Sequence, residues 1–225
     1  IKNFVDFCHN QGGITSNIEE VPSIVLGVSD ISLFEMLGAY TMFPNRGIRT
    51  EPVFISKIED KNGNVIFSAT PKQREVINEE TAYRMVDMMQ GVTQGGGTAT
   101  RLRYKFGLEG QMAGKTGTTN NQADAWYIGY TPQLLAGVWV GCDDRFLRFS
   151  STGQGQGAAA ALPIWAYFFK KIYADKNTGY TKDEKFISPD SYTKCGSAAS
   201  SGSNYYMNNT SDEEAEELGW EEGED

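Results

Sequence analysis

Three adjacent stretches decide the fold: QMAGKTGT at residues 111–118, DAWYIGY at 124–130 and LLAGVWV at 134–140. Each has the length of a strand, and the apolar residues alternate or form the short runs typical of β-structure. Thr131-Pro132-Gln133 supply a turn between the second and third stretches. The sequence therefore predicts three consecutive antiparallel strands.

Apolar residues at helical spacing flank these strands on both sides. A helix is predicted over 32–43, where Ser32 and Glu35 have the spacing of a capping box. A second helix follows Asn78 as its N-cap and ends at Gly91, and a third covers 158–174. Between the first two helices, Asn62-Gly63 predicts a hairpin of segments 53–57 and 64–68. The predicted fold class is α+β, an antiparallel sheet with helices on its faces.

Composition bounds the classes of function. The chain has 225 residues and 40% hydrophobic content, enough for one substantial core or two small ones. Its formal net charge is -9, but nine of the 29 acidic residues lie between Asp212 and Asp225. The remaining 20 acids balance the 20 basic residues, so the body has no basic excess that would attract a nucleic acid.

Cysteine and histidine are too sparse for a zinc site of the usual kind. Cys8, Cys142 and Cys195 are far apart, and His9 is the single histidine. We interpret His9 as a surface or packing residue, because no partner motif surrounds it. No metal or organic cofactor is implied.

The membrane and targeting signals are also limited. No apolar run reaches the ~18 residues of a membrane helix. The chain opens with Ile1 within a helix-like pattern, so we interpret it as a fragment whose N-terminus, with any anchor, lies upstream.

Two mechanisms compete for Gly114-Lys115-Thr116-Gly117-Thr118. A phosphate loop would need a glycine where Glu109 stands, and a helix where 124–130 has a strand pattern. Serine acyl transfer instead uses a Lys-Thr-Gly triplet on a strand that borders the active site. There the ammonium and the hydroxyl hold a substrate carboxylate, the glycine leaves room beside the strand, and the next N–H faces an oxyanion.

The surroundings of the triplet favour acyl transfer. The stretch 113–119 with DAWYIGYTP at 124–132 and VWVG at 138–141 resembles the closing part of the transpeptidase domain in class A penicillin-binding proteins. The resemblance runs from about Val21 to Lys171. It includes Val21-Pro22-Ser23, Leu26-Gly27-Val28, the helix at 35–41, Gly97-Thr98-Ala99 and the terminal helix at 160–165. It implies part of the penicillin-binding and serine β-lactamase fold.

The resemblance also implies an activity and the residues that carry it. The family acylates a serine with the D-Ala-D-Ala end of a peptidoglycan stem peptide, releases D-alanine and passes the acyl group to an amine; β-lactams are trapped as the acyl-enzyme. Carried over by position, Lys115 and Thr116 would hold the substrate carboxylate, Gly117 would keep the strand open, and Thr118 would add a hydroxyl and an oxyanion-hole N–H. Trp126 is a candidate for lining the donor cleft. The parent would carry an upstream glycosyltransferase domain and a membrane anchor, and would work on the outer face of the cytoplasmic membrane.

The nucleophile motif of the family is missing where it is expected. Ser-x-x-Lys and Ser-x-Asn should precede Lys115, yet the one Ser-x-x-Lys is Ser191-Tyr192-Thr193-Lys194, in the polar tail, and Ser-x-Asn does not occur. We interpret Ser191 as a coincidence, because a nucleophile needs a rigid base and oxyanion hole around it. The chain is therefore predicted to be inactive alone. The alternatives are a non-catalytic penicillin-binding-like interaction module and a phosphate-loop nucleotide hydrolase.

The predicted domain organisation has two parts. Residues 1–175 form the C-terminal portion of a transpeptidase domain, and 176–225 form a polar, then acidic, disordered tail. Trp126, Tyr127, Trp139 and Trp165 are interpreted mainly as core residues. Gly95-Gly96-Gly97 is interpreted as a turn, and Asp143 with Asp144 as a solvated strand end.

Overall fold

The computed structural model describes residues 1–194, and its centre is a three-stranded antiparallel sheet. The strands are β5 (Ala113–Thr118), β6 (Asp124–Tyr130) and β7 (Leu135–Gly141), in the order β5-β6-β7. Ala113 pairs with Tyr130 and Thr118 with Ala125, while Asp124 pairs with Gly141 and Tyr130 with Leu135. The predicted strands are confirmed, although β5 begins two residues later than expected. β5 lies at one edge, and within residues 1–194 no strand pairs with its outer side.

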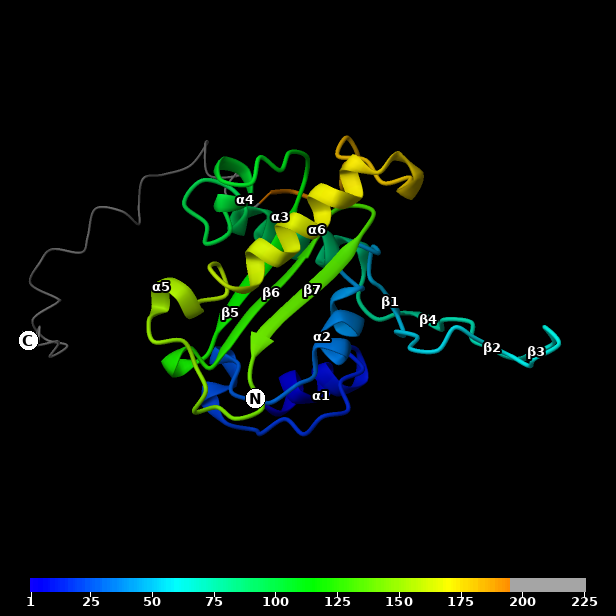
Figure 1. Ribbon diagram of the computed structural model, residues 1–225, viewed down its shortest axis with the longest axis horizontal. Helices are drawn as coiled ribbons and strands as arrows, with labels where there is room; N and C mark the ends of the chain where they lie inside the picture. The colour runs from blue at the N-terminus through cyan, green and yellow to red at the C-terminus, as the bar shows by residue number, and fades with distance from the viewer. Residues whose placement is uncertain (195–225) are drawn as a thin grey trace, which may run out of the picture. The chain divides into compact units, whose positions relative to one another are not determined.

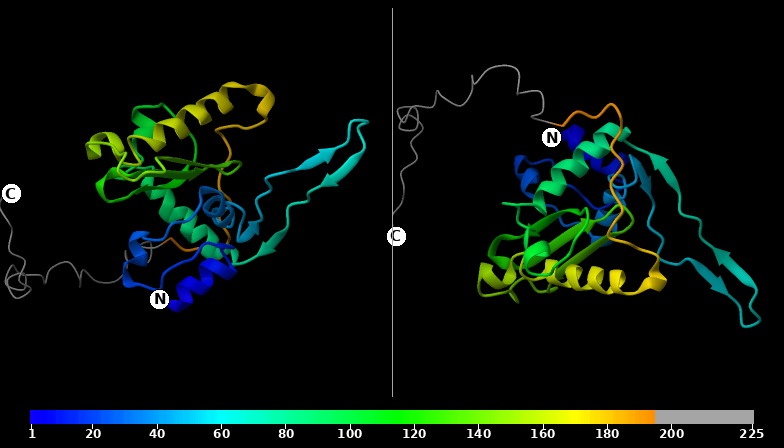
Figure 2. Two further views of the ribbon diagram at one scale, coloured as in Figure 1. Left: turned by 60° about the horizontal axis from the view of Figure 1, so that its bottom comes forward. Right: turned by 90° about the horizontal axis from the view of Figure 1, so that it is seen from above.

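Helix α6 (Ala161–Ala174) covers one face of the sheet, and helices α2 (Leu33–Tyr40) and α3 (Glu79–Val92) lie on the other (Figures 1 and 2). On the α6 face, Trp165 is fully buried, packs edge-to-face against Tyr127 and stacks on Phe169. Its indole N–H donates to the Gly129 and Ala136 carbonyls at 3.1 and 3.2 Å, which fixes the helix to β6 and β7. This satisfies the one polar group that a buried tryptophan brings into a core.

The helices on the opposite face begin at the predicted caps. Ser32 and Glu35 form the capping box of α2, and the Asn78 side chain accepts the Thr81 N–H at the start of α3. Val86 and Met89 of α3 pack with Ala113 and Tyr130. Thr93, buried at the end of α3, donates its hydroxyl to the Met112 carbonyl at 2.8 Å. This hydrogen bond fixes the end of α3 to the residue that precedes β5.

The remaining elements lie outside the central sheet and its three helices. They are α1 (Lys2–Asn10), η1 (Pro22–Leu26), β1 (Ile48–Thr50), β2 (Lys57–Glu59), β3 (Val65–Ser68), β4 (Gln73–Glu75), α4 (Arg101–Tyr104), η2 (Asn120–Gln122), α5 (Thr152–Gly155) and η3 (Lys176–Thr178). A hairpin forms from β2 and β3 as predicted, but its first strand lies at 57–59 and not at 53–57. The hairpin extends from β1 and β4 in Figure 1. None of the helices in 1–194 is long and apolar enough to span a bilayer.

Two sequence-based interpretations differ from the structure. Trp139 was assigned to the core, and this assignment is wrong. The side chain is 39% exposed because its position on β7 faces solvent, and its indole N–H donates to Asp124. The predicted tail begins at residue 176, whereas the compact unit extends to Tyr192. Phe186 is buried against Tyr130, and the Tyr192 hydroxyl donates to Asp87 at 2.7 Å. The rest of the predicted tail, with Cys195 and the acidic run, lies outside the described residues.

Candidate active site

Four consecutive residues of β5 form the centre of the candidate site. Lys115 and Thr118 are exposed, and Thr116 and Gly117 are partly buried. Lys115 lies opposite Ile128 and Thr116 opposite Tyr127, so successive side chains leave opposite faces of the sheet. β5 is an edge strand among the described residues, and an unpaired strand edge is a surface to which a second extended chain can add.

The Lys115 ammonium bends back toward its own strand. Its Nζ donates to the carbonyl oxygen of Thr116 at 2.8 Å. Among residues 1–194 no carboxylate lies within ion-pair distance of it. An exposed ammonium without an internal counter-ion, next to an open strand edge, is suited to an anionic ligand.

The Thr116 hydroxyl has a partner from another part of the chain. Its oxygen lies 3.0 Å from the hydroxyl oxygen of Thr98, on the connection between α3 and α4. Gly97-Thr98-Ala99 is one of the segments on which the family resemblance rests, but the sequence assigns Thr98 no role. The structure brings the two threonines together across 18 positions of sequence.

Thr118 has a comparable partner on the approach to α6. Its hydroxyl oxygen accepts the backbone N–H of Gly157 at 3.0 Å. Since this donor is an amide, the Thr118 hydroxyl proton remains available for a ligand. Sequence reasoning missed Gly157 as a site residue, because no local pattern connects it to β5.

Gly117 makes room for Trp126 on the neighbouring strand. The two residues are register partners, and a methyl group on Gly117 would lie 3.0 Å from the Cβ of Trp126. Trp126 therefore shares a face with Lys115, while Thr116 and Thr118 project from the other. The structure places Trp126 beside β5, but on the opposite face from the two hydroxyls.

The Asp124 carboxylate holds the connection between β5 and β6 in place through hydrogen bonds. Asp124 accepts hydrogen bonds from the Trp139 indole at 3.0 Å, the Thr119 hydroxyl at 3.1 Å and the Arg145 guanidinium at 3.3 Å. Partial burial would raise the pKa of Asp124, but these donors outweigh it and hold the pKa below its usual range. Asp124, the first residue of β6, is therefore held as an anion next to the end of β5.

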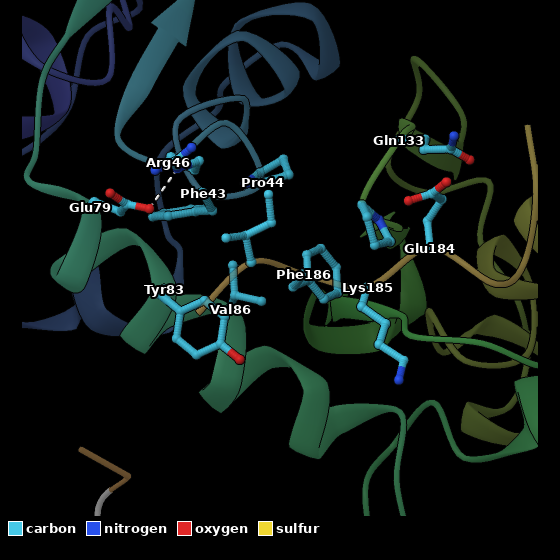
Figure 3. A pocket seen from close by; sticks show the side chains of 12 residues that line it. Phe43, Pro44, Arg46, Glu79, Tyr83, Val86, Gln133, Glu184, Lys185 and Phe186 are labelled. Atoms are coloured by element: carbon cyan, nitrogen blue, oxygen red, sulfur yellow. Dashed lines mark hydrogen bonds and ion pairs between the residues drawn. The ribbon is translucent and has the colours of Figure 1, made fainter. Parts of the chain in front are cut away.

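The other candidates do not join this site. Ser191 lies exposed beside α3, where its hydroxyl donates to Glu80 at 3.3 Å. Among residues 1–194 no group of three or more His, Cys, Asp or Glu side chains is arranged to hold a metal. A cavity of about 160 Å³ lies between α3 and residues 184–187 (Figure 3), and no β5 residue lines it.

The family follows from comparison with known proteins. Residues 10–142 match the family described as the penicillin-binding protein transpeptidase domain. The chain belongs to this family, and it corresponds to the transpeptidase domain of class A penicillin-binding proteins over most of its length.

Individual relatives agree with this assignment. Penicillin-binding protein 1A of Aquifex aeolicus is 36% identical over 156 residues, which cover 69% of this chain and 20% of that protein. Penicillin-binding protein 2D of Bacillus subtilis is 32% identical over 191 residues, covering 75% and 27%. The crystal structure of penicillin-binding protein 1A from Haemophilus influenzae superposes with a TM-score of 0.67 at 25% identity, covering 84% of this chain and 32% of that one. The chain thus spans about a fifth to a quarter of the curated relatives.

Proposed function

We propose that the chain is the C-terminal part of a serine-type DD-transpeptidase domain that cross-links peptidoglycan stem peptides. The observation that carries the proposal is the β5 edge, where the Lys115 ammonium has no carboxylate partner among residues 1–194 and the Thr116 and Thr118 hydroxyls stand nearby. Membership of the transpeptidase family supports it.

The reaction proceeds through an acyl-serine. A serine oxygen elsewhere in the complete protein attacks the carbonyl carbon of the penultimate D-alanine. The bond to the terminal D-alanine nitrogen breaks, and the leaving amine takes a proton. The amine of a neighbouring stem peptide then attacks the ester, forms the cross-link and returns the serine.

The four β5 residues from Lys115 to Thr118 each have a task in this scheme. Lys115 and Thr116 bind the terminal carboxylate of the stem peptide, because an ammonium and a hydroxyl together give charge-assisted hydrogen bonds. Thr118 contributes its hydroxyl, and its N–H stabilises the oxyanion that develops on the attacked carbonyl. Gly117 allows Trp126 to pack across the strand while the substrate lies along the strand edge. A β-lactam uses the same contacts and remains as the acyl-enzyme.

The chain lacks a Ser-x-x-Lys before Lys115, so it is inactive alone. The complete protein has a glycosyltransferase domain and a membrane anchor outside this chain, and it works at the outer face of the cytoplasmic membrane. Its partners are D-Ala-D-Ala stem peptides and β-lactams.

Intact mass after incubation with a labelled penicillin tests the proposal, on this chain and on the complete protein. We expect an adduct on the complete protein alone, at a serine outside residues 1–225. Lys115→Met lowers the acylation rate at least about tenfold, the effect of losing one charge-assisted contact, whereas exposed Lys72→Met leaves it unchanged. Absence of any adduct would favour the non-catalytic module, and an adduct at Ser191 would overturn the assignment of the nucleophile.

A further inference from the structure

Thr98 is a site residue to which the scheme above gives no task. It is exposed, and its hydroxyl oxygen lies 3.0 Å from that of Thr116. A threonine on a surface connection normally directs its hydroxyl to water, so a contact with the central threonine of β5 needs a physical reason.

The connection that carries Thr98 is held in place. A methyl group on Gly97 would lie 2.2 Å from the Val92 carbonyl oxygen, so the chain here passes directly over the end of α3. Ala99 is fully buried and its N–H donates to the same carbonyl at 2.9 Å. The Thr100 hydroxyl donates to the Gly97 carbonyl at 2.9 Å. Thr98 therefore projects from a backbone fixed on both sides.

The direction of this contact decides what Thr116 can offer to an anion, since either hydroxyl can be the donor. Each threonine hydroxyl has one proton to donate and two lone pairs that accept. If Thr116 gave its proton to Thr98, it would present only a lone pair to an anion. If Thr98 donates, the Thr116 proton is available, and the two aligned hydroxyls strengthen each other.

The neighbouring hydroxyl shows the same arrangement with an unambiguous donor. Thr118 Oγ1 accepts the Gly157 amide, which can only donate, at 3.0 Å. Each of the two hydroxyls of β5 thus has a hydrogen-bond partner from outside the sheet, and for Thr118 that partner is a donor.

We propose that Thr98 is a positioning residue of the anion-binding site: it donates its proton to Thr116 and thereby directs the Thr116 proton to the carboxylate of the ligand. This inference rests on the proposed function and deepens it, because it adds Thr98, acting through Thr116, to the recognition of the carboxylate by Lys115 and Thr116.

The test compares β-lactams with and without a negative charge. Acylation rates of the complete protein are measured with benzylpenicillin and with its methyl ester. Thr98→Val, which keeps the shape and removes the hydroxyl, lowers the rate with the free carboxylate about tenfold, as expected for one hydrogen bond to an anion-binding group. The rate with the ester changes less than about twofold, because the ester carries no charge for the oriented proton to bind.

Two further variants separate positioning from damage to the fold. Thr98→Ser restores most of the rate with the carboxylate, because it restores the hydroxyl. Exposed Thr70→Val, on the connection between β3 and β4, is the matched control and leaves both rates unchanged. Melting temperatures show that each variant is folded.

The outcomes discriminate clearly. Equal loss with the carboxylate and the ester, failure of Thr98→Ser to restore the rate, or an unchanged or faster Thr98→Val would overturn the role of Thr98 and leave the proposed function standing. If the unaltered protein forms no adduct with either compound, the proposed function fails, and the inference fails with it.

Discussion

The Cα of Gly157 lies directly against the backbone of Gly117. A methyl group on Gly157 would come within 2.5 Å of the Gly117 carbonyl oxygen and 2.3 Å of that of Trp126. The approach to α6 is thereby held close to the strand that carries the candidate site, and the Gly157 N–H reaches Thr118 at 3.0 Å. This proximity is possible only for a residue without a side chain.

Gly157→Ala is expected to push the approach to α6 away from β5. The added methyl group meets backbone atoms, which move only together with their strands, so we expect a loss of about 1–3 kcal/mol in the free energy of unfolding. The hydrogen bond to Thr118 lengthens, and acylation of the complete protein slows. The control is Gly153→Ala in α5, where the nearest atom to the new methyl group would be the Ser151 hydroxyl at 3.9 Å. Equal effects of the two substitutions would contradict the prediction.

Glu35 fixes the segment before α2 to the start of that helix. One carboxylate oxygen accepts the Thr15 and Ser16 amides and the Thr15 hydroxyl at 2.8–2.9 Å, and the other accepts the Ser16 and Ser32 hydroxyls at 2.7 Å. Burial alone would raise the pKa of Glu35, but the hydrogen bonds from Ser16, Ser32 and Thr15 outweigh it and hold the pKa well below its ordinary value.

Glu35→Gln is therefore expected to destabilise the protein in a pH-dependent way. At pH 7 the loss is about 2 kcal/mol, because hydrogen bonds to a charged acceptor are replaced by bonds to an amide. The Glu35 carboxylate makes its full contribution to the free energy of unfolding above its unfolded-state pKa of about 4.3. This contribution is lost as the pH falls below that value. The difference between the two proteins in denaturant unfolding should shrink toward pH 3. The exposed control Glu20→Gln should show no such pH-dependent difference. If the free energies of unfolding of Glu35→Gln and the unaltered protein differ by the same amount at every pH, the charge of Glu35 has no role.

The sheet and its helices could be predicted because their signals are local. The strand pattern of 124–130 and the turn at 131–133 lie within one short stretch, and Ser32 and Asn78 mark helix starts through neighbours three residues away. The candidate β5 residues were found for the same reason, as a contiguous motif.

The rest of the site depends on contacts between distant residues. Thr98 meets Thr116 and Gly157 meets Thr118 only after α3, the sheet and α6 have packed, and no periodicity records such pairs. The strands β1 and β4 have three residues each and pair around the β2–β3 hairpin, so their sequences carry too little pattern to identify them. Trp139 was assigned to the core by its chemistry, whereas its position on β7 exposes it.

The phenol oxygen of Tyr127 offers a test of the core. Tyr127 is fully buried, and its hydroxyl has no hydrogen-bond partner within the described part of the chain. Burial raises the pKa of this phenol, because the anion would be desolvated.

Since burying an unpaired hydroxyl costs free energy, Tyr127→Phe should leave the free energy of unfolding unchanged or raise it by up to about 1 kcal/mol. The ring contact with Trp165 is retained. Tyr130→Phe is the matched comparison, because the Tyr130 hydroxyl contacts the Met89 sulfur at 3.3 Å, and it should not be stabilising. Loss of stability in Tyr127→Phe by more than about 1 kcal/mol would show that the hydroxyl has a partner.

Asp124 connects the end of β5 to β7 through its hydrogen bonds with Thr119 and Trp139. Its substitution tests whether these bonds keep the end of β5 in place. Asp124→Asn replaces an acceptor oxygen by an amide NH₂, which faces the Trp139, Thr119 or Arg145 donors that the carboxylate satisfied. We expect a loss of about 1–2 kcal/mol in stability. We also expect faster amide hydrogen exchange at Thr119, whose N–H donates to the Asp124 carbonyl at 3.1 Å. Exchange in α3 should stay unchanged, because only the connection between β5 and β6 loosens.

The pH dependence of this effect has a defined sign. The pKa of Asp124 is lowered in the folded protein. The carboxylate therefore stabilises the folded state fully above the unfolded-state pKa of about 3.9, and this stabilisation is lost as the pH falls below that value. Exchange at the Thr119 amide in the unaltered protein, corrected for intrinsic rates, should therefore approach that of Asp124→Asn at low pH. Exposed Asp143→Asn, just beyond β7, should leave the exchange unchanged. Equal exchange rates at pH 7 in Asp124→Asn and the unaltered protein would mean that the strand end is held by its backbone pairing alone.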